Sequence, residues 1–195
     1  MGDVAMAVPV IRALTKQYPA CKITVLSKPF LRPLFDEMPQ VSFFDAQVNT
    51  KHKGIIGLYK LYRELKKEKI THIADFHNVL RSKIVRALFI LSGKPSVSID
   101  KGRAEKKALT RTTNKVFRQL KTSHQRYADV LSTLGFSLDL TNTPLIKKKL
   151  LSEKVTLLTG LKEGYWIGIA PFAAFKSKVY PAHLMEEVIK KIASK

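Results

Sequence analysis

The stretch VPVIRALTKQYPACKITVLS, residues 8–27, joins two hydrophobic patterns of different period. Residues 8–17 repeat apolar side chains three and four positions apart, which is typical of a helix. Residues 22–27 are rich in β-branched side chains and predict a strand. A helix followed directly by a strand of this kind is half of the repeating unit of a parallel α/β sheet.

The alternation of helix and strand continues outward from this stretch. Strands rich in valine and isoleucine, separated by helices, predict a Rossmann-like α/β domain with one doubly wound parallel sheet and helices on both faces. Ligands of such sheets bind beyond the carboxyl ends of the strands, so we look for chemistry in the residues after each strand. Further strands are expected at residues 41–46, 71–76, 96–99 and 165–170, and further helices at residues 55–69, 79–91, 104–121, 125–134 and 182–193.

The pattern changes near residue 147. Residues 147–162 are polar and helical and precede a fresh strand, so we expect a first domain at residues 1–146, a linker at 147–164 and the start of a second domain at 165–195. One strand and one helix cannot bury both of their apolar faces, and the chain opens at a strand-to-helix turn with no strand before it. We therefore expect the sequence to be incomplete at both ends.

Composition excludes several classes of protein. The single cysteine, Cys21, excludes an internal disulfide framework and a cysteine-based metal cluster, and favours a reducing, cytoplasmic setting. The amino terminus lacks the pattern of a secretory signal. No stretch approaches the roughly 18 apolar residues that would indicate a membrane-spanning helix.

The charge is extreme, with 35 Lys and Arg against 15 Asp and Glu, a formal net charge of +20. Such a charge attracts polyanions, and nucleic acid, anionic lipid and phosphorylated glycans all qualify. The densest run, residues 101–126, holds nine Lys or Arg and one acid, Glu105. Such a run is usually a solvated helical face, and it could also be a platform for an anionic ligand.

The opening residues combine backbone freedom with a carboxylate at the expected ligand edge. Gly2 permits a tight turn and close approach of a ligand to the backbone. Asp3 could carry chemistry, or it could simply be the helix N-cap. Pro9 leaves two beginnings open for this helix, because a start near Asp3 places it inside and a start at Val8 makes it a normal first-turn proline.

The opening MGDVAMAVPVIRALTKQYPACKITVLSKP resembles the amino-terminal motif of the lipopolysaccharide heptosyltransferases, glycosyltransferase family 9. In that family a Gly-Asp turn leads into a helix with a Pro-x-x-x-Ala-Leu pattern, then an aromatic-Pro stop and a strand. Gly2 and Asp3 match the turn, and residues 9–14 match the helix. The resemblance implies that Asp3 is the catalytic base.

Two later motifs are similar to the same family. THIADFHNVLRS, residues 71–82, matches a strand ending in aspartate, a polar loop and a helix. GIAPFAAFKSKVYP, residues 168–181, matches the start of the second domain, although Phe172 replaces a usual glycine and Tyr180 a usual tryptophan. His124, Arg126 and Tyr127 loosely resemble its His-x-x-x-Arg-Tyr neighbourhood. The resemblance implies acceptor-binding roles for Gly2, Asp75, His77, Asn78, Arg81, Ser82, Arg103 and Arg126, and donor-phosphate roles for Lys176 and Lys178.

Each of these residues also has an ordinary structural interpretation. Asp75 could cap the next helix, His77 could be a surface loop residue, Arg81 could be solvated, and Lys178 could be one surface lysine among many. The sequence alone leaves both interpretations open.

The resemblance implies a GT-B fold in which residues 1–146 bind the acceptor and residues 165–195 begin the nucleotide-sugar domain. The implied reaction is inverting transfer of a heptose from a nucleotide sugar, expected to be ADP-heptose, to the lipopolysaccharide core, with no metal or other cofactor. The implied setting is the cytoplasmic face of the bacterial inner membrane, and the implied state is a monomer that binds no specific nucleic acid. We expect this chain alone to be inactive.

Three alternatives stay open. A basic nucleic-acid-binding protein would explain the charge, but no RRM, KH, zinc-finger or helix-turn-helix signature is present in the sequence. A dinucleotide-dependent enzyme would need a Gly-x-Gly-x-x-Gly motif, which is absent. A non-catalytic glycosyltransferase remnant would keep the resemblance without the activity.

Overall fold

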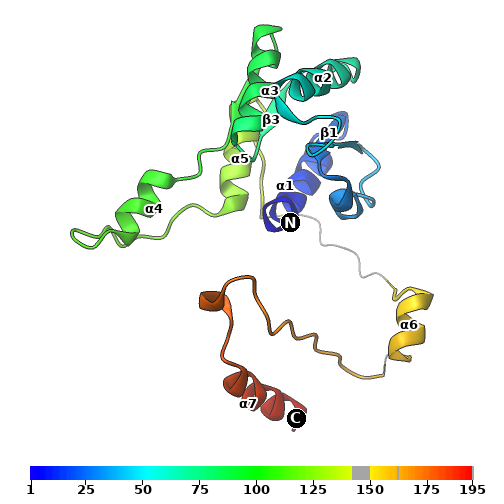
Figure 1. Ribbon diagram of the computed structural model, residues 1–195, viewed down its shortest axis with the longest axis vertical. Coiled ribbons are helices and arrows are strands. Elements are labelled where there is room, and N and C mark those ends of the chain that lie inside the picture. Colours follow the sequence, from blue (N-terminus) through cyan, green and yellow to red (C-terminus); the bar gives the residue numbers. More distant parts are fainter. Residues whose placement is uncertain (142–149, 162, 195) are drawn as a thin grey trace. The chain divides into compact units, whose positions relative to one another are not determined.

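The computed structural model describes residues 1–141, 150–161 and 163–194. The chain divides into two compact units, Met1–Ile146 and Lys147–Lys195. The first unit holds all four strands of the described residues and both hydrophobic clusters (Figure 1). The predicted division into two domains and a linker stays a prediction.

The first helix, α1 (Gly2–Gln17), answers the question that Pro9 left open. It begins at Gly2 and contains Pro9 in its interior. Proline has no N–H, so the carbonyl of Ala5 lacks its usual partner one turn later. Ala5 is exposed, so water can bond to that carbonyl and the helix continues. The buried side of α1 then packs as core, with Val10 and Ala13 fully excluded from solvent.

The strands pair in parallel, as predicted, but in two separate pairs. β1 (Ile23–Ser27) pairs with β2 (Val41–Asp45), and β3 (Ile73–Asp75) pairs with β4 (Ser96–Ser98). No described strand bridges β1 or β2 to β3 or β4, so the predicted single sheet is observed as two two-stranded sheets. The crossovers between paired strands are the 3-10 helix η1 (Pro29–Leu34) and the helix α3 (Leu80–Leu91).

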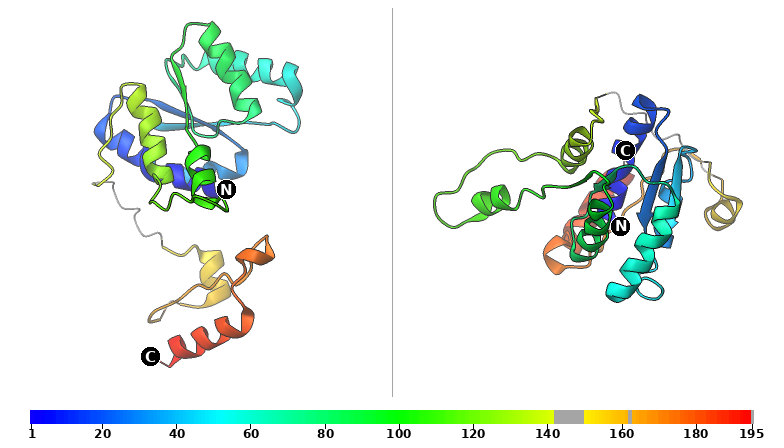
Figure 2. Two further views of the ribbon diagram at one scale, coloured as in Figure 1. Left: turned by 90° about the vertical axis from the view of Figure 1, so that its left-hand side faces the viewer. Right: turned by 90° about the horizontal axis from the view of Figure 1, so that it is seen from above.

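Helices lie on both faces of these strands. Successive strand residues point to opposite sides, so neighbouring side chains pack against different helices. Phe43 of β2 packs in the cluster formed by α1 and α5 (Ser123–Thr133), whereas the next residue, Phe44, packs in the cluster formed by α2 (Gly54–Lys67) and α3. Tyr62 of α2 meets Phe89 of α3 edge-on, with ring centroids 5.0 Å apart. Two layers of helix therefore enclose the strands (Figure 2).

The helix predicted at residues 104–121 is less than half as long as expected. It is observed as α4 (Arg103–Thr110), and residues 111–122 form no helix. Thr112 and Thr113 lower the helix propensity, and Asn114 has a φ of +48°, which a right-handed helix excludes. The segment from α4 to Lys121 extends away from the strands as a basic arm (Figures 1 and 2).

The second unit contains α6 (Glu153–Thr159), the 3-10 helix η2 (Lys176–Lys178) and α7 (Ala182–Ala193). The prediction of a strand at residues 165–170 is wrong: these residues form no strand, and Tyr165 and Ile167 are exposed. A strand needs a neighbour to satisfy its backbone groups, and no described segment pairs with this one. Among the described residues, no helix has the length and apolar character needed to cross a bilayer.

Candidate functional site

Asp75 closes the loop that follows β3. Its side chain is 5% exposed, and its Oδ1 accepts hydrogen bonds from the backbone N–H groups of His77, at 3.0 Å, and Asn78, at 2.8 Å. Its Oδ2 lies 3.9 Å from Nε of Arg86. This carboxylate therefore shapes its own loop, and it does not cap the next helix, whose N-cap is Val79.

Asn78 fastens this loop to the end of the neighbouring strand. It has a φ of +44°, in the left-handed region that asparagine tolerates, and its Nδ2 donates to the carbonyl of Ile99 at 3.0 Å. Ile99 follows β4, and its own N–H donates to the carbonyl of Asp75 at 2.9 Å. The carboxyl ends of β3 and β4 are thereby held together, at the edge where the fold predicts a ligand.

An open cavity of about 350 Å³ lies at this edge. Lys83, Lys101 and Arg103 bring three cations to its lining, against one acid, Asp100. The Oδ1 of Asp100 accepts from the N–H of Gly102 at 2.9 Å, so this carboxylate is engaged in its own turn. The balance of charge around the cavity suits an anion such as a phosphate group.

The other loop residues after β3 have varied positions. Ser82 caps α3, since its Oγ accepts from the N–H of Val79 at 3.0 Å and donates to the carbonyl of the same residue. His77 and Arg81 are exposed, and neither lines the cavity. Of the sequence-predicted residues after β3, the structure brings only Asn78 to the cavity.

Asp3 lies in the first turn of α1 and is exposed. The N-cap of the helix is Met1, so the interpretation of Asp3 as the N-cap is wrong; Gly2 and Asp3 are its first two helical residues. The hydroxyl of Tyr127 donates to the backbone carbonyl of Asp3 at 3.1 Å. Burial raises the pKa of Tyr127, and the negative charge of Asp3 raises it further.

Helix α5 links Asp3 to the cavity. Tyr127 reaches the first turn of α1, and the preceding residue, Arg126, donates through Nη1 to the carbonyl of Asp100 at 3.1 Å. Asp3 does not line the cavity. Two adjacent residues of α5 nevertheless contact Asp3 and Asp100, and Asp100 lines the cavity. Arg126 itself is buried, with 7% of its side chain exposed, while Arg103 lines the cavity directly.

Lys176 and Lys178 lie in the second unit, within η2, and both are exposed. The Nζ of Lys178 lies 5.4 Å from the ring centroid of Phe175, a cation–π contact within the unit. Their predicted donor-phosphate role stays a prediction.

Comparisons with known proteins place this geometry in context. No protein-family model matches the sequence, and no curated protein matches it. A solved structure described as a glycosyl transferase family 9 protein from Veillonella parvula is similar, with a TM-score of 0.62 and 21% identity. The chain shares its fold with this glycosyltransferase. The match covers 96% of this chain and 56% of that one, so the chain spans little more than half of the matched protein.

Sequence reasoning missed most of the cavity lining. Lys83 lies one turn into α3, and Ser98, Asp100 and Lys101 lie at or just after the end of β4. The rule that ligands bind after strand ends would have found the last two, because residues 96–99 were expected to form a strand. In residues 1–141, 150–161 and 163–194, no three His, Cys, Asp or Glu side chains are grouped so as to hold a metal ion.

Proposed function

We propose that this chain is the acceptor-binding half of a glycosyltransferase, which moves a sugar from a nucleotide-sugar donor to a hydroxyl of an anionic acceptor. The single observation that carries the proposal is the likeness of fold to a family 9 glycosyltransferase over 96% of the chain. The open, cation-lined cavity at the carboxyl ends of β3 and β4 supports it, because an anionic acceptor needs such a place.

In the proposed reaction, Asp3 accepts the proton of the acceptor hydroxyl while the oxygen of that hydroxyl attacks the anomeric carbon of the donor sugar. A new C–O bond forms, the bond to the nucleoside diphosphate breaks, and the configuration at the anomeric carbon inverts. Lys176 and Lys178 would neutralise the diphosphate as it leaves. The carboxylate of Asp3 is exposed, so an acceptor hydroxyl can reach it.

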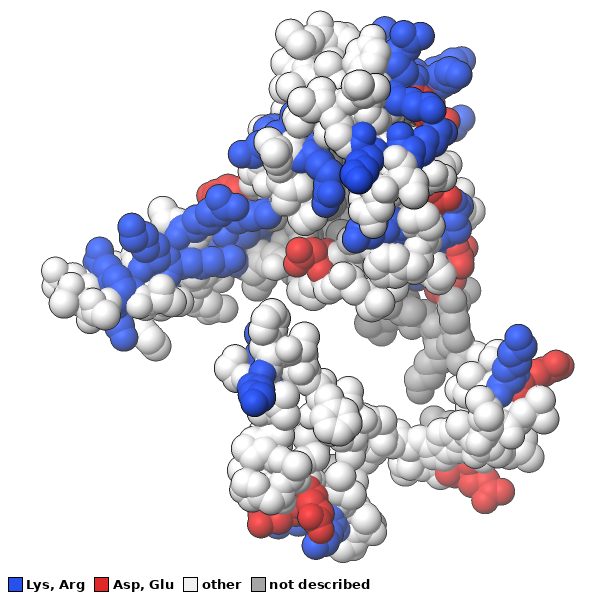
Figure 3. Space-filling view, viewed as in Figure 1, with Lys and Arg blue, Asp and Glu red and all other residues white. Residues whose placement is uncertain are grey.

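The acceptor that fits best is a phosphorylated glycolipid. Lys101 and Arg103 would hold a phosphate in the cavity, and the basic arm would face the anionic surface in which the lipid lies. Lysine and arginine side chains gather along that arm (Figure 3). Each contributes about 1 kcal/mol near an anionic membrane, decreasing with salt. We propose lipopolysaccharide core as the acceptor, ADP-heptose as the donor, and the cytoplasmic face of the inner membrane as the location.

Acceptor binding can be tested on the 195-residue chain. Vesicles carrying lipopolysaccharide that lacks heptose should bind it, and enzymatic removal of the lipid phosphates should weaken binding. The double variant K101A/R103A should weaken binding by about a hundredfold or more, since hydrogen bonds to charged groups contribute roughly 1.5–3 kcal/mol each. The control K22A/K94A removes equal charge from residues that precede β1 and β4, at the opposite edge. Equal loss in both double variants would contradict a cavity-specific acceptor.

The base is tested by transfer assays on the natural protein that contains this chain. Replacing Asp3 by Asn should lower kcat by about 10²- to 10⁴-fold and leave acceptor affinity unchanged, because only proton removal is lost. Unchanged kcat would exclude Asp3 as the base. A titration with DNA and RNA discriminates the nucleic-acid alternative, for which sub-micromolar affinity and a steep salt dependence at about 0.15 M salt would be expected.

A further inference from the structure

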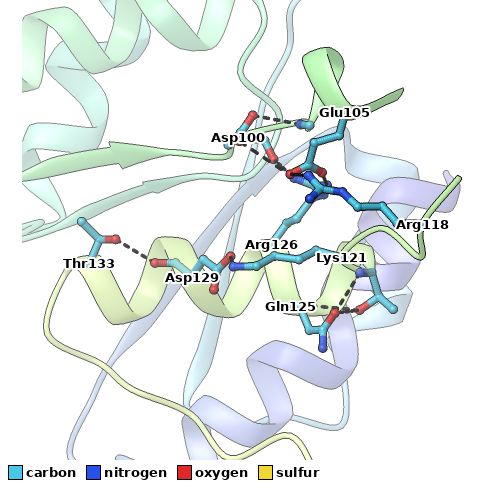
Figure 4. Close-up of polar contacts among 10 residues, drawn as sticks. Asp100, Glu105, Arg118, Lys121, Gln125, Arg126, Asp129 and Thr133 are labelled. Atoms are coloured by element: carbon cyan, nitrogen blue, oxygen red, sulfur yellow. Dashed lines mark hydrogen bonds and ion pairs between the residues drawn. The ribbon is translucent and has the colours of Figure 1, made fainter. Parts of the chain in front are cut away.

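Arg126 is a buried cation in a chain whose other basic residues are mostly exposed. It is 7% exposed, and two different groups hold its guanidinium. Nη1 donates to the carbonyl of Asp100 at 3.1 Å, and Nη2 donates to Oε2 of Glu105 at 2.7 Å. Figure 4 shows the guanidinium between these two residues. A buried charge is costly unless it is paired and hydrogen-bonded, so this arrangement depends on both partners.

The turn between those partners is shaped around the guanidinium. Gly102 has a φ of +59°, and a Cβ at this position would lie 2.3 Å from Nη2 of Arg126. Its N–H donates to Asp100 Oδ1 at 2.9 Å, and its carbonyl accepts from the N–H of Lys106 at 2.9 Å, within the first turn of α4. Only glycine fits both the backbone conformation and the space that Arg126 fills.

The same turn carries two of the three cations of the cavity. Lys101 lies immediately before Gly102, Arg103 lies immediately after it, and both line the cavity. Oε1 of Glu105 also lies 3.9 Å from Nη2 of Arg118, in the later part of the basic arm that leads back toward α5. The pair formed by Arg126 and Glu105 thus anchors the base of the arm to α5.

We propose that Arg126 is a positioning residue: it contacts no ligand, and it fixes the turn from Asp100 to Glu105 so that Lys101 and Arg103 flank the cavity. This deepens the acceptor role proposed above for the cavity, and it replaces the direct acceptor contact that the sequence suggested for Arg126. Arg126 does not line the cavity, and each of its two Nη atoms donates to the turn, one to Asp100 and the other to Glu105.

Inorganic phosphate is a suitable probe, followed by NMR of the backbone amides in the uniformly ¹⁵N-labelled chain. Phosphate should shift the amides of Lys101 and Arg103 in the wild type. In R126M, the Gly102 amide should move or broaden without phosphate, and phosphate affinity should fall. The loss should be about ten- to hundredfold, the range seen when a residue that orients a metal ligand is removed.

The conservative variant R126K separates positioning from charge. Lysine keeps the charge but lacks the planar fork that reaches both Asp100 and Glu105, so R126K should lose affinity as R126M does. R32M is the matched control: it removes an arginine that pairs with Asp45 at 2.9 Å, outside both the cavity lining and the basic arm, and it should leave the Gly102 amide and phosphate affinity unchanged.

Two further variants keep the test valid if the Arg126 variants do not fold. E105Q and G102A act on the same turn, and both should displace the Gly102 or Lys101 amide and weaken phosphate binding. The positioning role would be overturned by wild-type phosphate affinity together with a wild-type Gly102 amide shift in folded Arg126 variants or E105Q, or with a wild-type Lys101 amide shift in G102A. A different result is that the wild-type chain binds no phosphate while the turn still moves in these variants. That result would contradict the proposed acceptor cavity and support the positioning of the turn by Arg126.

Discussion

Replacing Tyr127 by Phe removes one hydroxyl from the contact between α5 and the first turn of α1. The ring stacks on Phe76, with centroids 4.6 Å apart and planes inclined by 26°, and this packing should survive. The hydrogen bond to the carbonyl of Asp3, at 3.1 Å, is lost. Because Tyr127 is only 3% exposed, we expect a loss of about 1 kcal/mol in the free energy of unfolding. The melting temperature should fall by roughly 3 °C.

The pH dependence makes this prediction sharper. Burial and then Asp3 raise the pKa of Tyr127 above its ordinary value of 10.0, so the folded chain keeps the phenol proton where the unfolded chain releases it. The stability that this neutral phenol confers is present below pH 10.0 and is lost as the pH rises toward the folded-state pKa. The difference in the free energy of unfolding between wild type and Y127F should therefore narrow above pH 10.0. The other tyrosines and the lysines titrate equally in both chains, so their contributions cancel in this difference.

Urea unfolding of both chains, followed by circular dichroism at steps from about pH 7 to about pH 11, measures the effect. Y18F is the control, because Tyr18 donates a similar bond to the carbonyl of Ser137 at 3.0 Å from a half-buried position, and its loss should be smaller. A Y127F chain as stable as the wild type at pH 7, with no change in the gap at alkaline pH, would refute the account of this contact.

Two further substitutions test the packing and charge of α2. G57A should destabilise the chain by about 1–3 kcal/mol, because the new Cβ would lie 2.4 Å from the backbone of His52; G2A, where a Cβ meets nothing within 4 Å, is the neutral control, and thermal melts compare them. The pKa of Glu64 is lowered mainly by the hydrogen bond from Lys51; burial raises it, and a hydrogen bond to His52 lowers it again. The stability that ionised Glu64 confers is therefore present above pH 4.5 and is lost as the pH falls through the folded-state pKa. E64Q should thus be less stable than the wild type at neutral pH and match it in acid, and equal urea midpoints at both pH values would contradict this.

The parts of the fold set by local pattern were predictable from the sequence. β1 and β2 lie within the expected strands, and Gly93 and Gly135 follow helices with positive φ, as helix-ending glycines do. The remainder depended on tertiary partners. Residues 165–170 have the composition of a strand. A strand forms only when a neighbouring strand pairs with its backbone, and no described residues pair with this segment. A periodic pattern cannot show whether that neighbour is present.

The candidate site divides in the same way. The residues after β3 were found because strand ends can be recognised in the sequence, but their individual roles were set by contacts such as that of Asp75 with its own loop. Arg126 was harder, because it lies in a run of nine basic residues that the sequence presents as a solvated face. Its burial depends on Glu105, 21 positions earlier, and on the space left by Gly102. No spacing rule connects those three positions.

The geometry of α5 gives a reason for these two neighbours to act together. Adjacent residues of a helix point about 100° apart, so Arg126 and Tyr127 reach two different places from one rigid element. One holds the turn that lines the cavity, and the other holds the first turn of α1, which carries Asp3. A shift of α5 would therefore move a cavity wall and the proposed base together. In a transferase whose acceptor must meet its base within hydrogen-bond reach, one helix then sets the separation between the group that anchors the acceptor and the group that takes its proton.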